Sequence, residues 1–469
     1  MILEQDVAVV EHSVDPSIFR AYDIRGIVGE SLTVESVYAL GRALGSLAQE
    51  IGERRIVVGR DGRLSGPVLF EALCKGLVAT DCDVIELGIV PTPLLYYATY
   101  LLETTSGVML TGSHNPPEYN GLKMVVGGEA LSEEGIKNLY QRVMKKQYLQ
   151  GAGKRREVDI VGHYINQLTD DIDLVRPLKI VVDGGHGVAG DVAARLYRQL
   201  GCEVDELYCN VDGNFPDHHP DPSQPENLQD LIQRVREVQA DVGLAFDGDG
   251  DRLGVVTSQG KVIWPDRLLM LFAKSMLAEN PGAKIIYDVK CTSHLAGFIR
   301  DFGGQPIMWK TGHSFIKAKL AETQALLAGE MSGHVFFKDR WYGFDDAIYA
   351  GARLLEILAN EADASDTLFN LIPDSINTPE MKIHVSEKEK FSLMQRLIDQ
   401  ADFAEAEEVN TIDGVRVNFA DGWGLVRPSN TTPCLILRFE AANEIVLTKI
   451  QELFRHWLLS VQGDLVLPF

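Results

Sequence analysis

Three segments of the chain repeat one pattern, in which a basic residue leads into an apolar run that ends near a Gly or an Asp. These segments are Arg55–Arg60, Lys179–Gly184 and Lys284–Val289. A second apolar segment follows each of them 20 to 30 residues later, at Cys82–Leu87, Cys202–Leu207 and Gly304–Trp309. Apolar residues in the intervals have helical spacing, and a strand, a helix and a strand at this distance predict a βαβ unit. Three such copies predict three similar mixed α/β domains that arose by duplication.

A third predicted strand in each unit leads into a polar loop. These strands are Gly107–Leu110, Val242–Phe246 and Ala325–Ala328, and the loops that follow them read TGS, DGDGDR and GEMSGH. Ligand sites in α/β sheets gather at the carboxyl ends of strands. We therefore expect the three loops to face one central cleft where the domains meet.

The length of the chain requires more than one hydrophobic core, because 469 residues exceed what a single core organises. After about Pro373 the pattern changes to short alternating segments and one acidic helical stretch, which predicts a smaller C-terminal α+β domain. The predicted domains are 1–155, 156–261, 262–372 and 373–469.

A net charge of −23 argues against a general nucleic-acid or anionic-membrane binder, so we expect neither kind of partner. The longest notable uncharged run, Leu87–Leu102, is short and contains two prolines, so it does not predict a membrane span. The N-terminal segment has early acids and no basic region, which argues against a secretory signal. Six cysteines without a CxxC pair predict reduced, mostly buried thiols. We expect a cytoplasmic protein and a monomer.

The loop after Gly107–Leu110 presents a serine, Ser113, in the sequence TGSHNPP. Gly, Asn and Pro in this density favour a turn rather than a helix or strand interior. A hydroxyl on a tight turn past a strand end can act as a nucleophile. Taken alone, however, the motif is more typical of a surface turn whose serine bonds its own backbone.

Asp247, Asp249 and Asp251 alternate with glycines in the second loop. On a curved loop their carboxylates can converge on one centre, and such hard oxygen ligands suit Mg²⁺. The EF-hand pattern does not fit, because Arg252 and Ser258 stand where its glycine and its bidentate Glu belong. A solvated acidic turn is the alternative, and repulsion among three close carboxylates argues against it. A phosphate on Ser113 could complete the coordination of the metal.

Four motifs occur in order along the chain: TGSHNP, DGDGDR, GEMSGH and RPSNTT. Together with FRAYDIRG at Phe19–Gly26, they resemble the α-D-phosphohexomutase family, and most closely its phosphomannomutase/phosphoglucomutase branch. The resemblance extends over essentially the whole chain. It implies three similar α/β domains and a C-terminal domain around a central cleft, in agreement with the repeat.

The resemblance also implies a reaction. Ser113 would carry a phosphate in the resting enzyme, and Asp247, Asp249, Asp251 and an oxygen of the phosphoserine would hold Mg²⁺. The phosphoserine would phosphorylate a hexose 1-phosphate or 6-phosphate of mannose or glucose, and the hexose 1,6-bisphosphate intermediate would return its other phosphate to Ser113. Such a transfer depends mainly on positioning and on charge neutralisation.

Further roles follow from motif position. Arg25, Lys123 and Arg252 would supply positive charge, and Glu330 and Ser332 would bind sugar hydroxyls. The non-reacting phosphate would be bound by Arg427, Ser429, Asn430 and Thr431. Lys290, Gly312 and His313 resemble further substrate contacts, and Tyr22 resembles a family residue beside the nucleophile. Lys123, His114 and His334 are the candidates for the general acid or base.

Three alternatives stay open at this stage. Asp247-Gly-Asp-Gly begins like the nucleophile motif of haloacid dehalogenase-type phosphatases and mutases, although Asp251 replaces its Thr. A phosphoglucosamine mutase of the same family would differ in only a few sugar contacts. A non-catalytic sensor of sugar phosphates on this fold would need neither Ser113 nor the three aspartates.

Overall fold

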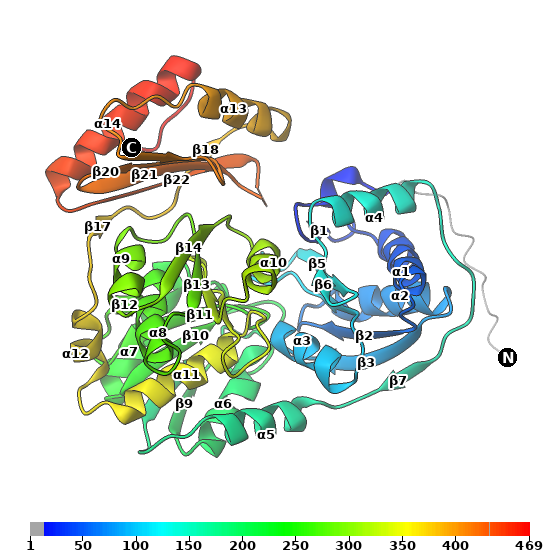
Figure 1. Cartoon of the computed structure of the whole chain (residues 1–469). Helices are drawn as coiled ribbons and strands as arrows, with labels where there is room; N and C mark the ends of the chain where they lie inside the picture. Colours follow the sequence, from blue (N-terminus) through cyan, green and yellow to red (C-terminus); the bar gives the residue numbers. More distant parts are fainter. Residues whose placement is uncertain (1–13, 431) are drawn as a thin grey trace. The chain divides into compact units, whose positions relative to one another are not determined.

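The computed structural model describes residues 14–430 and 432–469, so the N-terminal segment predicted to lack a secretory signal lies largely outside the described residues. The chain divides into two compact units. The first contains the described residues up to 173 together with 179–231 and 244–251, and the second contains 174–178, 232–243 and 252–469. Four separate sheets are formed along the chain (Figure 1).

The first sheet follows the order β1-β5-β4-β2-β3-β7, with β6 paired to β5. Its strands are β1 (Ile24–Ile27), β2 (Arg55–Arg60), β3 (Asp83–Ile89), β4 (Gly107–Leu110), β5 (Tyr119–Val126), β6 (Glu129–Ala130) and β7 (Arg155–Glu157). A 3-10 helix at Pro16–Ile18 precedes α1 (Val34–Glu50), α2 (Gly66–Val78), α3 (Thr92–Leu101) and α4 (Glu134–Met144). β2 pairs in parallel with β3 and β4, whereas β4 and β5 are antiparallel.

Alternate residues of the first sheet pack under its helices. Ile56 and Val58 of β2 and Val108 and Leu110 of β4 join one apolar core with residues of α1, α2 and α4. Every second residue points to the same face because a strand is pleated. The opposite face of β2 and β4 is contacted by α3. α1 begins at a capping box in which the Thr33 side chain accepts from the Ser36 backbone.

The second and third sheets repeat this arrangement. The second comprises β8 (Lys179–Asp183), β9 (Glu203–Leu207), β10 (Val242–Phe246), β11 (Leu253–Thr257) and β12 (Val262–Ile263), with α5 (Val161–Asp171), α6 (Ala189–Gln199), a 3-10 helix (Pro225–Leu228) and α7 (Gln229–Val238). The third comprises β13 (Lys284–Asp288), β14 (Gln305–Trp309), β15 (Leu327–Gly329) and β16 (Val335–Phe337), with α8 (Pro265–Glu279), α9 (His294–Asp301), α10 (His313–Thr323), α11 (Ala347–Asn360) and α12 (Ser365–Asn370).

The three sheets share one strand order. The neighbours run β3-β2-β4-β5 in the first, β9-β8-β10-β11 in the second and β14-β13-β15-β16 in the third. The prediction of three similar α/β domains is thus confirmed. One predicted strand is displaced: β15 begins at Leu327 rather than at Ala325. The reason is that Gln324 ends α10 in the left-handed conformation, so the chain is still turning there.

The C-terminal domain is built on an antiparallel sheet with two helices. Its elements are β17 (Ile376–Asn377), β18 (Met381–His384), α13 (Glu387–Asp399), β19 (Glu408–Asn410), β20 (Val415–Phe419), β21 (Gly422–Pro428), β22 (Cys434–Ala441) and α14 (Glu444–Val461). Both helices cover one face of the sheet and share its core (Figure 1). The sequence pattern predicted only one helical stretch in this domain, so the second helix is a correction. The buried residues of α14 recur at helical spacing, and they are Leu447, Ile450, Phe454, Trp457 and Leu458.

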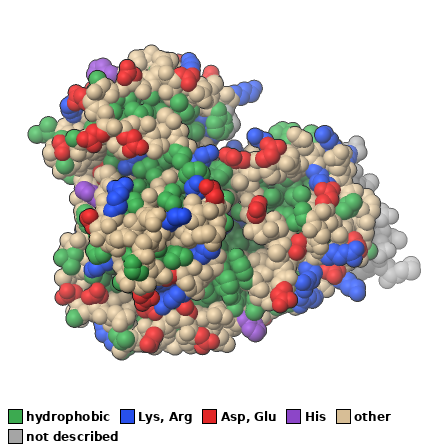
Figure 2. Space-filling model, viewed as in Figure 1, with side chains coloured by type: hydrophobic (Ala, Val, Ile, Leu, Met, Phe, Trp, Pro, Cys, Tyr) green, Lys and Arg blue, Asp and Glu red, His purple; other side chains and the backbone are tan. Residues whose placement is uncertain are grey.

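Two general expectations can be compared with the structure. All six cysteines are free and buried, as predicted. In the described part of the chain, helices long and apolar enough to cross a membrane are absent. On the face drawn in Figure 2, acidic and basic side chains are interspersed rather than gathered in a basic patch.

Candidate active site

Ser113 lies directly beyond β4 in the first unit, and its side chain is not on an open surface. The residue is 2% exposed and has a left-handed backbone, with φ +49°. Its backbone N–H donates to Thr111 Oγ1 at 2.7 Å, and its Oγ donates to Asp247 Oδ2 at 2.8 Å. His114 Nδ1 lies 3.1 Å from the same Oγ. The interpretation of the motif as an exposed turn is therefore wrong, because the hydroxyl is directed at a second buried polar loop.

That second loop follows β10 and places three carboxylates together. Oδ1 of Asp247 accepts from the backbone N–H groups of Gly250 at 3.0 Å and Asp251 at 3.1 Å, which curls the loop. One carboxylate oxygen of each of Asp247, Asp249 and Asp251 lies within 4.8 Å of the others. All three residues are 0% exposed. The sequence prediction that these side chains converge on a curved loop is borne out by this geometry.

A lysine and a threonine of the first unit donate hydrogen bonds to the carboxylates. Lys123 on β5 donates to Asp249 Oδ2 at 2.7 Å and also bonds Asp251. Thr92 adds a hydrogen bond to Asp249 Oδ2 at 2.5 Å. Oδ1 of Asp249 is buried and accepts no hydrogen bond from the described residues. Three buried carboxylates that lie this close together form an oxygen donor set that fits a hard divalent cation such as Mg²⁺.

The loop of residues 247–252, here called the metal loop, approaches the loop of residues 111–118, called the serine loop, through backbone atoms. A Cβ at Gly248 would stand 2.4 Å from the carbonyl oxygen of Ser113, so only glycine allows this approach. Arg25 on β1 pairs with Asp23 at 2.5 Å and donates to Asn115 Oδ1 at 3.2 Å. Arg25 is thus held beside the serine loop. Tyr22 lies two residues before the start of β1.

Two residues of this region escaped the sequence analysis. Asp61 and Arg63 follow β2, and both are almost completely buried, at 2% and 1% exposure. Burial raises the pKa of Asp61 and lowers the pKa of Arg63, while the charge of each partner opposes that shift. Both residues could have been predicted as site residues, because they lie at the carboxyl end of a central strand, where the other candidate loops also lie.

In the second unit, the loop after β15 forms a polar cluster around Glu330. One of its oxygens lies 2.9 Å from His334 Nδ1, and the other accepts from the Gly312 backbone. Ser332 Oγ is also 2.9 Å from His334 Nδ1. Burial tends to raise the pKa of Glu330, but the hydrogen bonds from His334 and Gly312 and the charges of His334 and Lys290 together outweigh burial, so the pKa is lowered. His334 therefore belongs to this loop, and its Nε2 accepts from Arg252 Nε at 3.4 Å.

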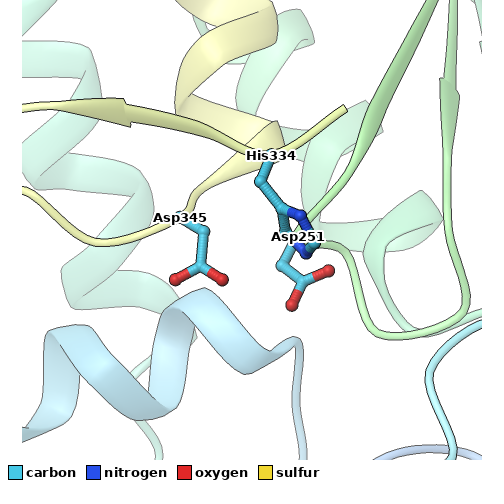
Figure 3. Close-up of side chains that lie close together, drawn as sticks. All are labelled: Asp251, His334 and Asp345. Carbon is cyan, nitrogen blue, oxygen red and sulfur yellow. The ribbon is translucent and has the colours of Figure 1, made fainter. Parts of the chain in front are cut away.

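A second histidine lies beside His334. The rings of His313 and His334 are 5.6 Å apart, and His313 Nδ1 is 3.5 Å from Asp345 Oδ2. Lys317 also pairs with Asp345, at 2.8 Å. Figure 3 shows His334 between β15 and β16 and Asp345 just before α11, and it draws Asp251 at the end of the metal loop, where the chain continues with Arg252.

Lys290 lies just beyond β13, and its ammonium is buried rather than solvated. It donates to Glu380 at 2.6 Å. Burial lowers the pKa of Lys290, but the charges of Glu380 and Asp288 outweigh this, so the pKa is raised. Burial likewise opposes ionisation of Glu380, yet Lys290 lowers the pKa of Glu380 to about 2. Glu380 is a partner that the sequence analysis did not identify.

The fourth motif forms a turn between β21 and β22. Arg427 Nε donates to Asp413 Oδ2 at 2.9 Å, and Asp413 also accepts from the Thr311 backbone at 2.9 Å. Asn430 Nδ2 donates to the Thr311 carbonyl at 3.3 Å, and Ser429 Oγ is 2.8 Å from Thr432 Oγ1. Arg427 and Ser429 are buried, at 3% and 2% exposure. Thr431, also assigned to this loop from sequence, lies outside the described residues.

Models of known families match the chain in four consecutive segments. The models are described as phosphoglucomutase/phosphomannomutase, with alpha/beta/alpha domains I, II and III and a C-terminal domain. They match residues 16–150, 162–260, 264–375 and 380–456.

Individual relatives agree with the family models. The chain is 57% identical to a phosphomannomutase/phosphoglucomutase of Pseudomonas aeruginosa over 453 residues, 97% of this chain and 98% of the relative. It is 53% identical to a phosphoglucomutase of Neisseria gonorrhoeae, over 94% of this chain and 97% of the relative. A solved phosphoglucomutase/phosphomannomutase family protein of Burkholderia thailandensis is 52% identical, with a TM-score of 0.93 over 97% of this chain and 100% of its own.

Proposed function

Because the chain belongs to the phosphoglucomutase/phosphomannomutase family, an enzyme family that isomerises hexose phosphates, we propose a specific route for its reaction. The enzyme interconverts hexose 1-phosphate and hexose 6-phosphate of mannose, glucose or both. Phosphorylated Ser113 donates its phosphoryl group, hexose 1,6-bisphosphate is the intermediate, and the second phosphate of this intermediate returns to Ser113. The observation that carries this proposal is the 2.8 Å hydrogen bond from Ser113 Oγ to Asp247.

The metal loop supports phosphoryl transfer at this serine. Asp247, Asp249 and Asp251 would hold Mg²⁺ together with an oxygen of the phosphoserine. When bound, the ion would neutralise negative charge on the phosphoryl group during its transfer. Lys123, which already bonds two of the carboxylates, adds a positive charge in the same place.

The proton balance assigns a role to His114. When phosphoserine gives up its phosphoryl group, the bond between Oγ and phosphorus breaks and a bond to the sugar hydroxyl oxygen forms. The departing Oγ gains a proton, and the attacking hydroxyl loses one. Ser113 Oγ donates to Asp247, so His114 Nδ1 at 3.1 Å is the hydrogen-bond donor to Oγ in this arrangement. His114 is therefore placed to protonate Oγ, while Lys123 stays a candidate for the proton of the attacking hydroxyl.

The loops of the second unit have the chemistry for the rest of the substrate. Glu330 and Ser332 offer acceptor and donor groups to sugar hydroxyls, with Arg252, Lys290, Gly312, His313 and His334 contributing around them. A guanidinium binds phosphate with two parallel hydrogen bonds, which suits Arg427 for the non-reacting phosphate. Ser429, Asn430 and Thr431 complete this loop. Arg25 and Tyr22 are assigned to the surroundings of the nucleophile.

The remaining alternatives are not favoured. Relatives more than half identical over nearly the whole chain carry phosphomannomutase or phosphoglucomutase names rather than phosphoglucosamine mutase names. A haloacid dehalogenase would use Asp247 as nucleophile, but here its Oδ1 is engaged by the backbone of its own loop. A sensor has no need of a buried serine bonded to a carboxylate triad.

The deciding experiment is labelling of the enzyme with hexose 1,6-bisphosphate that carries radioactive phosphate. We expect one alkali-labile, hydroxylamine-resistant label on Ser113, located by mass spectrometry. Ser113→Ala should fold normally, take up no label and lose mutase turnover. Label in Ser113→Ala, or label that hydroxylamine removes, would exclude the phosphoserine and favour an aspartyl phosphate.

A parallel assay addresses the sugar. Coupled assays of mannose 1-phosphate, glucose 1-phosphate and glucosamine 1-phosphate, each with a trace of its bisphosphate, should show turnover of the first two. We also propose that the enzyme acts in the cytoplasm as a monomer with sugar phosphates as its partners. We further propose that its four domains have the limits predicted from sequence, except that β7 extends the first domain to Glu157. The six buried free thiols are in keeping with a reducing compartment.

A further inference from the structure

Arg63 makes an unusual set of contacts with the loop that carries Ser113. Its two terminal nitrogens donate to the backbone carbonyls of Ser113 at 2.8 Å, Asn115 at 2.5 Å, Pro116 at 2.5 Å and Tyr119 at 2.9 Å. One guanidinium thus satisfies three carbonyl oxygens of the serine loop and a fourth at Tyr119, the first residue of β5. Its side chain has 0% exposure.

Asp61 completes the arrangement on the other side of the guanidinium. Its Oδ2 accepts from Arg63 Nε at 3.2 Å, from Thr111 Oγ1 at 2.8 Å and from the Gly112 backbone at 3.0 Å. Thr111 Oγ1 in turn accepts from the Ser113 backbone N–H at 2.7 Å. The amide of Ser113 is therefore linked to Asp61 through Thr111, and its carbonyl is bound by Arg63.

The fit between Arg63 and the loop is close. A Cβ at Gly112 would lie 2.2 Å from Arg63 Nε and 2.3 Å from its Cζ. The ring of Phe215 covers the guanidinium, with its centroid 5.4 Å from Cζ. His219 of the same segment bonds the His114 carbonyl. Arg63, which is 1% exposed, is thus enclosed between the serine loop and residues 215–219.

We propose that Arg63, oriented by Asp61, is a positioning residue that holds Ser113 in its left-handed conformation and so directs Oγ at Asp247. A left-handed non-glycine residue is strained, so it persists only where surrounding contacts enforce it. Arg63 donates to backbone carbonyls of the loop and not to Ser113 Oγ. It therefore acts on the position and direction of the Ser113 side chain rather than on the hydroxyl itself. This inference rests on the proposed role of Ser113 as the phosphate carrier.

The test uses Arg63→Ala and Arg63→Lys in the full-length enzyme. A displacement of the nucleophile by about 1 Å lowers kcat by about 100-fold, and we expect this loss in Arg63→Ala with KM little changed. Transfer of label from the phosphoenzyme to hexose phosphate should slow by the same factor. Free guanidinium at millimolar concentration should restore part of kcat in Arg63→Ala, whereas methylammonium should not. Arg63→Lys keeps the charge but cannot bond four carbonyls in a plane, so its kcat should also fall.

Arg353 provides a matched control. It is a buried arginine paired with an aspartate, Asp339, at 2.8 Å, and it lies in α11, outside the proposed active-site residues. Arg353→Ala should lose thermal stability as Arg63→Ala does, but keep its kcat and show no rescue of kcat by guanidinium. The control separates the general cost of removing a buried guanidinium from an effect on the nucleophile.

Gly112→Ala tests the same inference with Arg63 intact. Its new methyl group occupies the place of the guanidinium, so the variant should show the same selective loss of kcat. Wild-type kcat in Arg63→Lys and Gly112→Ala would overturn the inference, as would a loss in Arg63→Ala that matches its unfolded fraction or appears only in KM. Labelling of Ser113→Ala would instead overturn the role of the serine, so the two failures are distinguishable.

Discussion

Replacing Gly248 by alanine should uncouple the metal loop from the nucleophile while leaving every polar side chain in place. The new Cβ would stand 2.4 Å from the carbonyl oxygen of Ser113 and 3.2 Å from its carbonyl carbon, whereas ordinary contact begins near 3.4 Å. Both neighbours are backbone atoms, so rotation of a side chain cannot relieve the overlap. The backbone of Gly248 lies outside the left-handed region, so alanine adds no conformational strain of its own.

The two loops must therefore separate by about 1 Å, a displacement that costs about 100-fold in rate, or about 2.7 kcal/mol of transition-state stabilisation. The 2.8 Å hydrogen bond between Ser113 Oγ and Asp247 would lengthen with it. We expect kcat in a coupled mutase assay to fall by this factor and the Mg²⁺ concentration needed for half-maximal activity to rise.

Gly162→Ala is the control, since a Cβ at Gly162, in the first turn of α5, meets nothing within 4 Å. This variant should keep wild-type kcat and be slightly more stable, because alanine is favoured over glycine in helices by up to about 1 kcal/mol. Wild-type kcat and an unchanged Mg²⁺ response in Gly248→Ala would refute the close contact of the loops as a requirement for transfer.

The remaining predictions concern the metal, the phosphate and pH. Asp249→Asn should weaken Mg²⁺ binding, measured by titration calorimetry, and lower turnover in parallel; an unchanged affinity would contradict the metal loop. Arg427→Ala should raise KM markedly for both hexose phosphates in steady-state assays, and an effect on neither would remove it from phosphate binding. Burial opposes the charged form of His218, but the hydrogen bonds to Asp183 and His219 and the charges of Asp183 and Asp230 together outweigh burial and raise the pKa of His218 to about 9. The charged pair therefore stabilises the fold fully below pH ~6.5, and this contribution is lost as pH rises through about 9. Asp183→Asn should flatten that part of the pH dependence of the melting temperature, and an unaltered slope in the variant would refute the linkage.

Much of the fold could be predicted because its signals are local and periodic. The apolar runs Arg55–Arg60, Lys179–Gly184 and Lys284–Val289 all correspond to central strands of their sheets, at β2, β8 and β13. The second helix of the C-terminal domain was missed although its apolar spacing is helical. The start of β15 was misplaced because the end of α10 depends on a single left-handed residue, Gln324.

The candidate site was predictable where several chemically distinctive residues lie in one loop. The three aspartates converge because short glycine-spaced segments can curl, and the order of the four motifs carried the family resemblance. Partners drawn from elsewhere in the chain were not predictable. Glu380 is 90 residues from Lys290, and Arg63 is 50 residues from Ser113. A solitary charged residue has no periodic or motif signal that reveals which backbone it will bind.

Residues close together in the chain encode the three-fold α/β repeat, the convergence of the three aspartates on one loop and the place of Ser113 beyond a strand end. The burial, backbone conformation and hydrogen bonding of Ser113 depend instead on tertiary contacts. It is buried rather than exposed, it is left-handed, and its hydroxyl is bonded to Asp247. This is because the burial of a hydroxyl and its hydrogen-bond partners depend on which groups the folded chain brings together. Asp61 and Arg63 stabilise the serine loop only because β2 and β4 are neighbours in one sheet.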